Sequence, residues 1–124
     1  MDIAQCARLP GQELSSVLIA TSSVRLQFVK YPLLPNGRFM DACLIDIEHG
    51  FELASSDECE VFLSKEGIAA FRVGASGLVR MIEQLVVDAV WSPEGNLQLR
   101  FDGGHYLSIL QGDDGFEGFA VHMG

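Results

Sequence analysis

The stretch "LQLRF" at residues 97–101 decides the fold of this chain, and a near-copy, "VRLQF", stands at residues 24–28. Both alternate apolar and polar residues, which puts the apolar set on one face of a β-strand and the polar set on the other. An offset of 73 residues also superposes the apolar pairs that precede the two stretches, Leu14 and Val17 on Val87 and Val90. This pattern indicates either an internal repeat or the convergent patterning of two half-buried strands.

Further alternating runs extend this pattern to an antiparallel sheet with one face in water. The runs lie at residues 43–47 and 107–109, with a short last strand, "FAVHM", at 119–123. Turn-forming residues join the runs into a meander of hairpins: "EHG" at 48–50, "SPEGN" at 92–96 and "DGG" at 102–104. In contrast, "YPLLPNG" at 31–37 is predicted to be a loop, because its two prolines disfavour a central strand.

One helix is predicted over residues 75–85. Leu78, Met81, Ile82 and Leu85 recur there at helical spacing, and Ser76 is placed to cap the start. The alternative is an extended segment, because the stretch also contains poor helix formers. If the repeat is real, "IAQCAR" before Pro10 is the short N-terminal counterpart of this helix. The predicted fold is one α+β domain over residues 1–124, mainly antiparallel sheet with one packed helix, and with two related halves as a hypothesis.

The charge balance favours a basic protein partner. Seventeen acids and eight bases give a net charge of −9, and such a surface repels phosphate backbones, which argues against nucleic-acid binding. Opposite fields speed and orient docking to a basic partner. The alternative is that the charge serves solubility alone.

The cysteines and the start of the chain favour the cytoplasm. An odd count of three cysteines without a CxxC motif predicts free thiols in a reducing compartment. The start, "MDIAQCARLP", has neither a basic region nor a long apolar run, so no secretion signal is expected. No apolar run approaches the ~20 residues that a membrane span needs, so no membrane association is expected.

Catalysis and metal binding are not expected. The histidines, His49, His105 and His122, are not spaced as metal ligands. Cys43 is predicted to be a core residue, and Cys59 stands among acids that raise the pKa of a thiol. No phosphate-binding loop with its lysine is present, and no cofactor is expected.

The acidic clusters are interpreted as a surface for binding a protein. Their members are Asp57, Glu58 and Glu60 in one group and Asp113, Asp114 and Glu117 in another. Carboxylates placed where the phosphates of a nucleic acid would lie can block a basic nuclease. Trp91 is a candidate aromatic anchor if its side chain is exposed, and its alternative role is core packing next to Val90.

The stretch "LQLRFDGGHYLSILQGDDGFEGFAV" at 97–121 resembles the C-terminal half of a group of small bacterial β-rich domains. Their signature is Leu-x-Leu-x-Phe-x-(Asp)-Gly-x-x-Leu, then an acidic (Tyr/Phe)-Glu and a closing strand. The matching residues here are Leu97, Leu99, Phe101, Asp102, Gly103, Leu107, Phe116 and Glu117. Some such domains resemble immunity proteins of polymorphic toxin systems, including contact-dependent growth inhibition. The resemblance implies a protein that binds and silences one cognate toxin, and it implies no catalytic residues.

These observations predict a cytoplasmic, non-enzymatic immunity protein, a monomer or weak homodimer, that occludes a basic nuclease-type toxin stoichiometrically. The first alternative is a structural or regulatory module that associates with itself through a sheet edge. The second is a minor enzyme, which a deep polar pocket holding two acids or a His–Cys pair would support.

Overall fold

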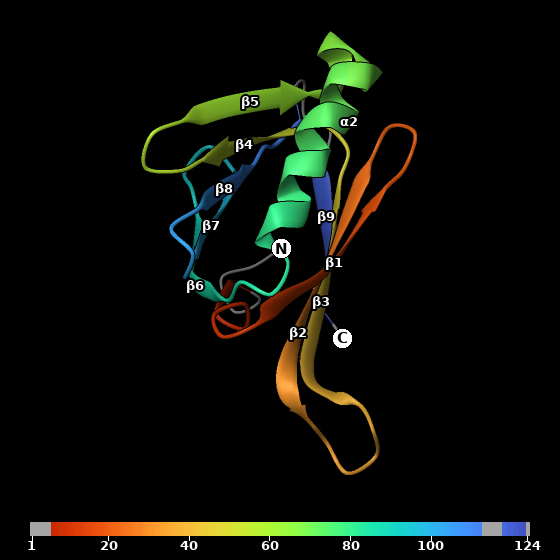
Figure 1. Cartoon of the computed structure of the whole chain (residues 1–124), viewed down its shortest axis with the longest axis vertical. Helices are drawn as coiled ribbons and strands as arrows, with labels where there is room; N and C mark the ends of the chain where they lie inside the picture. Colours follow the sequence, from red (N-terminus) through yellow and green to blue (C-terminus); the bar gives the residue numbers. More distant parts are fainter. Residues whose placement is uncertain (1–5, 113–117, 124) are drawn as a thin grey trace.

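The computed structural model describes residues 6–112 and 118–123 of the chain. Its elements in chain order are β1 (Glu13–Ile19), β2 (Val24–Leu33), β3 (Phe39–Ile47), β4 (Gly50–Ala54), β5 (Cys59–Leu63), η1 (Ser64–Glu66), α2 (Ile68–Gly77), η2 (Leu78–Met81), β6 (Val86–Trp91), β7 (Leu97–Phe101), β8 (Tyr106–Ile109) and β9 (Phe119–Met123) (Figure 1).

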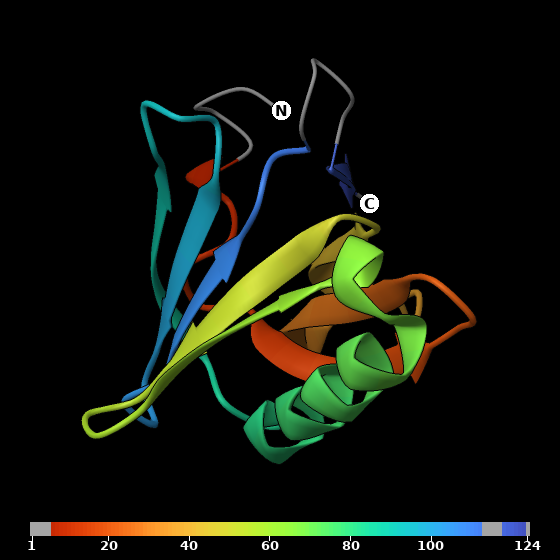
Figure 2. The ribbon, with the colours of Figure 1, turned by 90° about the horizontal axis from the view of Figure 1, so that it is seen from above.

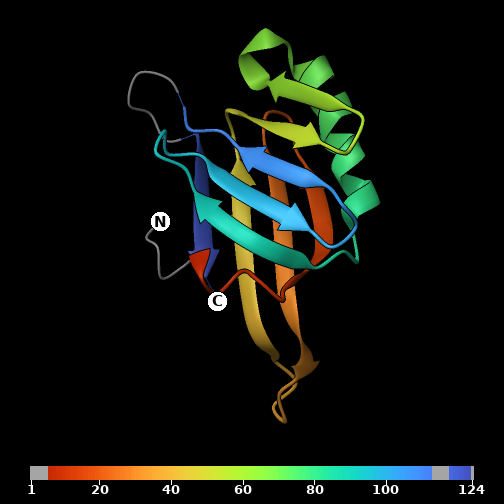
Figure 3. The same ribbon diagram turned by 90° about the vertical axis from the view of Figure 1, so that its left-hand side faces the viewer.

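The strands form two antiparallel sheets, with strand orders β1-β2-β3-β9 and β5-β4-β8-β7-β6. The strands of one sheet cross those of the other (Figure 3). Helix α2 contacts β5, at the edge of one sheet, and β1, at the edge of the other (Figure 2). The predicted fold, α+β with mainly antiparallel sheet and one packed helix, is confirmed.

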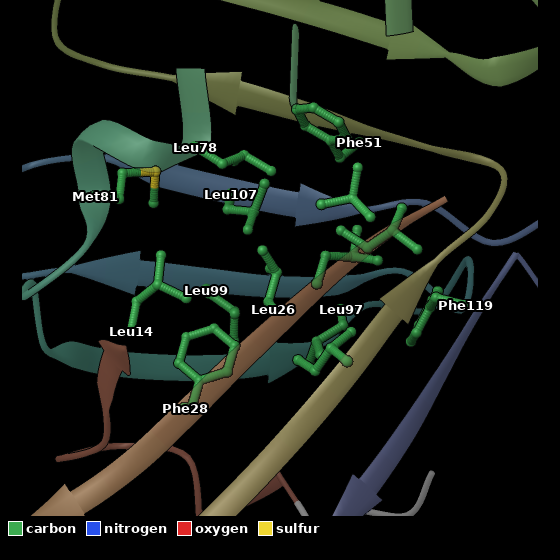
Figure 4. Close-up of a cluster of buried hydrophobic side chains, with 14 of the residues drawn as sticks. Leu14, Leu26, Phe28, Phe51, Leu78, Met81, Leu97, Leu99, Leu107 and Phe119 are labelled. Atoms are coloured by element: carbon green, nitrogen blue, oxygen red, sulfur yellow. The ribbon is translucent and has the colours of Figure 1, made fainter. Parts of the chain in front are cut away.

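The core lies between the two sheets and is built from the alternating rows that the sequence indicated. The buried row of β2 is Val24, Leu26 and Phe28, and that of β7 is Leu97, Leu99 and Phe101. The rings of Phe28 and Phe101 stack with centroids 6.3 Å apart and so join the sheets. Figure 4 shows Leu26 and Phe28 of β2 in the same cluster as Leu97 and Leu99 of β7. Each large apolar side chain buried in this way contributes about 1.5–3 kcal/mol relative to an exposed one.

The β1–β2 and β6–β7 hairpins have the same register. Leu14 pairs with Phe28 as Val86 pairs with Phe101, and one extra residue then forms a bulge in β1 and in β6. In β6 the extra residue is Val87, which is 42% exposed, whereas Leu14 is fully buried. The offset of 73 residues therefore holds for the second strand of each hairpin, but the first strand follows an offset of 72. The predicted match of Leu14 with Val87 is wrong by one residue, because the turn between β6 and β7 (residues 92–96) is one residue longer than the turn between β1 and β2 (residues 20–23).

The segments that lead into β1 and β6 also match, at the offset of 72. They cross each other and exchange two reciprocal pairs of backbone hydrogen bonds. The first pair runs from the Gly11 N–H to the Val86 oxygen and from the Glu83 N–H to the Leu14 oxygen, both at 2.8 Å. The second runs from the Leu14 N–H to the Gln84 oxygen at 3.0 Å and from the Val86 N–H to the Gln12 oxygen at 2.9 Å. The bridge between Glu13 and Leu85 lies between these pairs. Each segment thus provides hydrogen-bond partners for backbone N–H and C=O groups of the other.

The two halves contribute four strands each, β1–β4 and β6–β9. The fourth strand of each half, β4 or β9, lies in the sheet that contains the first three strands of the other half. After β3 the chain passes into β4, where Phe51 pairs with Ile109 of β8. After β8 it reaches β9, where Phe119 pairs with Ile47 of β3. The entries to both strands carry "GF", at 50–51 and 118–119. Residues 13–54 and the described residues between 86 and 123 thus form two halves of the same topology, interlocked by exchanged strands.

Two parts of the structure lie outside this matched framework. One is the segment from β5 to α2 between the halves. The other is the end of the β2–β3 hairpin, which projects beyond the body of the molecule (Figures 1 and 3). The prediction of a loop at 31–37 is wrong at its start, because β2 continues through Pro32 to Leu33. The strand tolerates proline there because β1 pairs with β2 only as far as Val29, which leaves one edge of β2 without a neighbouring strand.

The helix begins earlier than the sequence pattern predicted. α2 runs from Ile68, and a 3₁₀ turn ends it at Met81, so residues 82–85 lie outside it. The predicted cap, Ser76, lies near its C-terminal end, where its hydroxyl donates to the Val73 oxygen at 2.6 Å. The true start follows Gly67, whose φ of 136° suits glycine. The first half of the proposed N-terminal counterpart at residues 3–8, residues 3–5, lies outside the described residues.

Candidate functional site

The first acidic cluster lies on the β4–β5 hairpin. Asp57 and Glu58 stand in its turn and Glu60 in β5, and all three are exposed. Glu60 pairs with Leu53 and Phe62 pairs with Phe51 across β4 and β5. Because residues two apart share a face, Phe62, Glu60 and Glu58 follow one another along the side of β5 that turns toward the core and α2.

A groove of about 340 Å³ runs between this side of the hairpin and helix α2. Its apolar part comes from Leu53 and Phe62, which pack against the core, and from the exposed side chain of Val73 on α2. Glu58 and Glu60 place carboxylates on the same groove. The groove therefore combines an apolar wall with exposed negative charge.

Two basic groups, Arg80 from η2 and His105 from the β7–β8 turn, also line the groove. His105 Nδ1 lies 3.4 Å from the side-chain oxygen of Gln84, which orients its ring. The sequence pattern missed this side of the groove, because η2 and the β7–β8 turn meet the hairpin only in the folded chain. The positive charge of Arg80 limits where a cationic ligand can lie in the groove.

A close approach between α2 and β5 shapes the groove. A methyl group at Gly74 would overlap the ring of Phe62. Glycine at this position therefore lets the helix approach the strand while the ring of Phe62 stays beside Phe51, with centroids 5.3 Å apart. The contact was not visible in the sequence, since glycine inside a helix reads only as a weak helix former.

Glu52 and Cys59 lie next to the cluster but on the outer face of the sheet. The Cys59 thiol donates a hydrogen bond to Glu52 Oε1 at 2.7 Å. This bond, with some burial and the charge of Glu52, raises the pKa of Cys59. The predicted direction is confirmed, but the acid responsible is Glu52 on the neighbouring strand, not the acids beside Cys59 in the sequence. Cys43 is a core residue as predicted, and burial raises the pKa of its thiol to about 12.

Trp91 does not join the acidic cluster. It stands in β6, at the opposite edge of the five-stranded sheet from β5, about 19 Å away at ~4.8 Å per strand spacing. Its ring packs on Phe119, with centroids 5.7 Å apart, and it is partly buried against the core. This placement favours the packing role over the role of an exposed anchor.

The second acidic cluster, Asp113, Asp114 and Glu117, lies outside the described residues. Glu58 and Glu60 are therefore the predicted site residues that the structure brings together around one groove.

The described residues hold no group of three His, Cys, Asp or Glu side chains that is placed to bind a metal ion. Over the same residues, no helix has the length and apolar character needed to cross a membrane. His122 lies 3.5 Å from a carboxylate oxygen of Asp46, which is already paired with Arg25.

Comparisons of the chain with protein-family models, with curated proteins and with solved structures gave no match.

Proposed function

We propose that this chain is a protein that acts by binding, and specifically an immunity protein that neutralises a basic, nuclease-type toxin domain in the cytoplasm by stoichiometric occlusion. The observation that carries the proposal is the groove beside α2, where Glu58 and Glu60 stand next to the apolar side chains of Phe62 and Val73. This combination suits a lysine or arginine side chain of a partner protein.

The proposed binding mode follows from the two kinds of surface in the groove. The aliphatic stem of a partner lysine or arginine would lie along Phe62 and Val73, since such stems bury well on apolar surface. Its charged end would reach the carboxylates of Glu58 and Glu60, where charge-assisted hydrogen bonds are the stronger kind. The net charge of −9 would steer a basic toxin toward this surface and speed its association.

The test compares charge reversals inside and outside the groove. The probe is the basic domain encoded by the reading frame next to that of this chain, co-expressed and purified with it. We expect Glu60→Lys to weaken the complex at least tenfold and to slow association at low salt. Asp57→Lys is the matched control, because it makes the same charge change on the same hairpin without lining the groove.

Two results would reject the proposal. One is the failure of the neighbouring basic domain to co-purify with the unmodified chain. The other is an equal loss of affinity in the two variants, which would mean that net charge alone governs binding. Circular dichroism of both variants checks that the hairpin change leaves the fold intact.

The alternative function, a self-associating structural or regulatory module, is favoured by one separate observation. The projecting end of the β2–β3 hairpin exposes several large apolar side chains, and exposed apolar patches often mark interaction sites.

A further inference from the structure

The projecting end of the β2–β3 hairpin, residues 30–40, is here named the apolar arm. It exposes five large apolar side chains, each between 36% and 53% accessible: Tyr31, Leu33, Leu34, Phe39 and Met40. Figure 1 shows the arm extending from one end of the molecule, while α2 and β5 lie toward the other end. A two-stranded hairpin is at best marginally stable alone in water, so an arm with this composition gains from a covering surface.

The arm is held in one shape by its own contacts. The rings of Tyr31 and Phe39 meet edge to face with centroids 5.4 Å apart. The turn is closed by the Leu34 N–H, which donates to the Arg38 oxygen at 2.7 Å. A preorganised aromatic pair loses little conformational freedom on binding. The arm also carries Tyr31 and Arg38, and tyrosine and arginine are common among the residues that dominate binding energy at interfaces.

The charge of the arm is opposite to that of the rest of the chain. Lys30 and Arg38 are its charged residues, and it contains no acid. Since the whole chain has a net charge of −9, the remaining residues have a net charge of −11. The arm is therefore an apolar and basic element attached to an acidic body, and its complement is a surface that is both apolar and acidic.

The groove between α2 and the β4–β5 hairpin has this complementary character. It offers Phe62 and Val73 as apolar surface, and its two carboxylates, Glu58 and Glu60, outnumber the cation Arg80. We propose that two copies of the chain form a twofold dimer in which the apolar arm of each copy docks in this groove of the other. Because arm and groove lie toward opposite ends of the long axis, two copies side by side in opposite directions bring each arm to the partner's groove (Figure 1). Such a reciprocal contact closes after two copies.

A second copy explains the arm better than an anionic membrane does. Aromatic and basic residues also suit a lipid surface, but the −11 charge of the remaining residues opposes approach to anionic lipid. The inference is independent of the proposed toxin. The arm of a second copy and the proposed toxin would both contact Glu58 and Glu60. Dimer formation and toxin binding would therefore compete for one groove.

The experiment measures the mass of the purified full chain by sedimentation equilibrium, without any toxin, over micromolar to hundreds of micromolar concentrations. We expect a reversible dimer that weakens as salt rises, because the arm and groove have opposite charges. Leu33→Ser with Met40→Ser should abolish it. These side chains are exposed and lie outside the Tyr31–Phe39 ring pair, so circular dichroism of the double variant should match that of the unmodified chain.

A charge exchange tests whether the arm meets this groove. Arg38→Glu and Glu60→Arg should each raise the dimer dissociation constant at least tenfold, and the two changes together should restore most of the loss. Arg100→Glu, an exposed charge reversal outside the arm and the groove, is the matched control and should have a smaller effect.

Three results would overturn the proposal. They are a monomer at every concentration, a double charge variant no tighter than the single variants, and arm variants that lose binding to phosphatidylserine vesicles while the self-association of the chain is unchanged. Because no toxin is present, none of these results depends on the proposed immunity function.

Discussion

The crossing of the two matched segments predicts that glycine at position 83 stabilises the chain more than alanine does, which reverses the usual order of the two residues. Glu83 has a φ of 81°, and among the described residues it is the one non-glycine residue with positive φ. Its counterpart in the other half is Gly11, with a φ of 90°. The reciprocal hydrogen bonds to Leu14 and Val86 hold both residues in this conformation, which L side chains adopt at a cost of roughly 1–2 kcal/mol.

Comparing Ala and Gly at position 83 isolates this backbone cost, because both substitutions remove the exposed carboxylate. At ordinary strand or helix positions Ala is more stable than Gly by about 0.5–1 kcal/mol. At Glu83 we expect the order to reverse, with Glu83→Gly more stable than Glu83→Ala by about 1 kcal/mol. For a chain of this length that difference corresponds to about 3–6 °C in Tm.

The assay is urea unfolding of the two variants, with thermal unfolding as a second measure. Gly11→Ala serves as the matched experiment in the other half. It should lose a similar amount for the same reason, since the nearest atom to an added methyl, Lys30 Nζ, lies at an ordinary 3.7 Å. If Glu83→Ala proves as stable as Glu83→Gly, the conformation assigned to the crossing is incorrect, and the match between the halves loses its strongest support.

Three further predictions concern stability and thiol chemistry. Gly50→Ala should destabilise the chain by several kcal/mol or prevent folding, because the added methyl would lie about 2.5 Å from a backbone carbonyl oxygen of β5; a normal urea midpoint would contradict this. Asp46→Asn should lose stability at neutral pH, because the hydrogen bond from Arg25 lowers the pKa of Asp46 below its unfolded value. That loss should shrink as the pH falls through the folded-state pKa of the acid, which a series of unfolding curves from pH 7 to 3 would check. Glu52→Gln should lower the pKa of Cys59 and speed its alkylation by iodoacetamide at pH 8, and an unchanged rate would mean that the hydrogen bond does not hold the thiol proton.

The tertiary structure corrected the predicted repeat. The alternating pattern identified β2 and β7 correctly, because burial on one face of a strand leaves a period of two in the sequence. It could not locate the bulge at Val87 or show that the turn before β7 is one residue longer than the turn before β2, since neither changes the alternation within β2 and β7. The exchange of β4 and β9 between the sheets also left no local signal, because a strand that crosses to another sheet has the same alternation as one that stays.

The candidate site was predictable only in part. Acidic composition singled out Glu58 and Glu60, but Arg80 and Phe62 joined them only through the approach of α2 to β5. The apolar arm did leave a signal in the sequence. The stretch "YPLLPNGRFM" at 31–40 is unusually apolar, although residues 31–37 were predicted to form a loop.

By itself, the sequence determined the class of the fold, the core faces of the main strands and the acidic character of the surface. These features depend on local periodicity and on composition, which any short stretch of chain displays. The crossing at Gly11 and Glu83, the exchanged strands and the groove were decided by the tertiary structure alone. Each depends on contacts between residues far apart in the chain, and the energy of such contacts is set by close packing and shared hydrogen bonds rather than by the residues on either side.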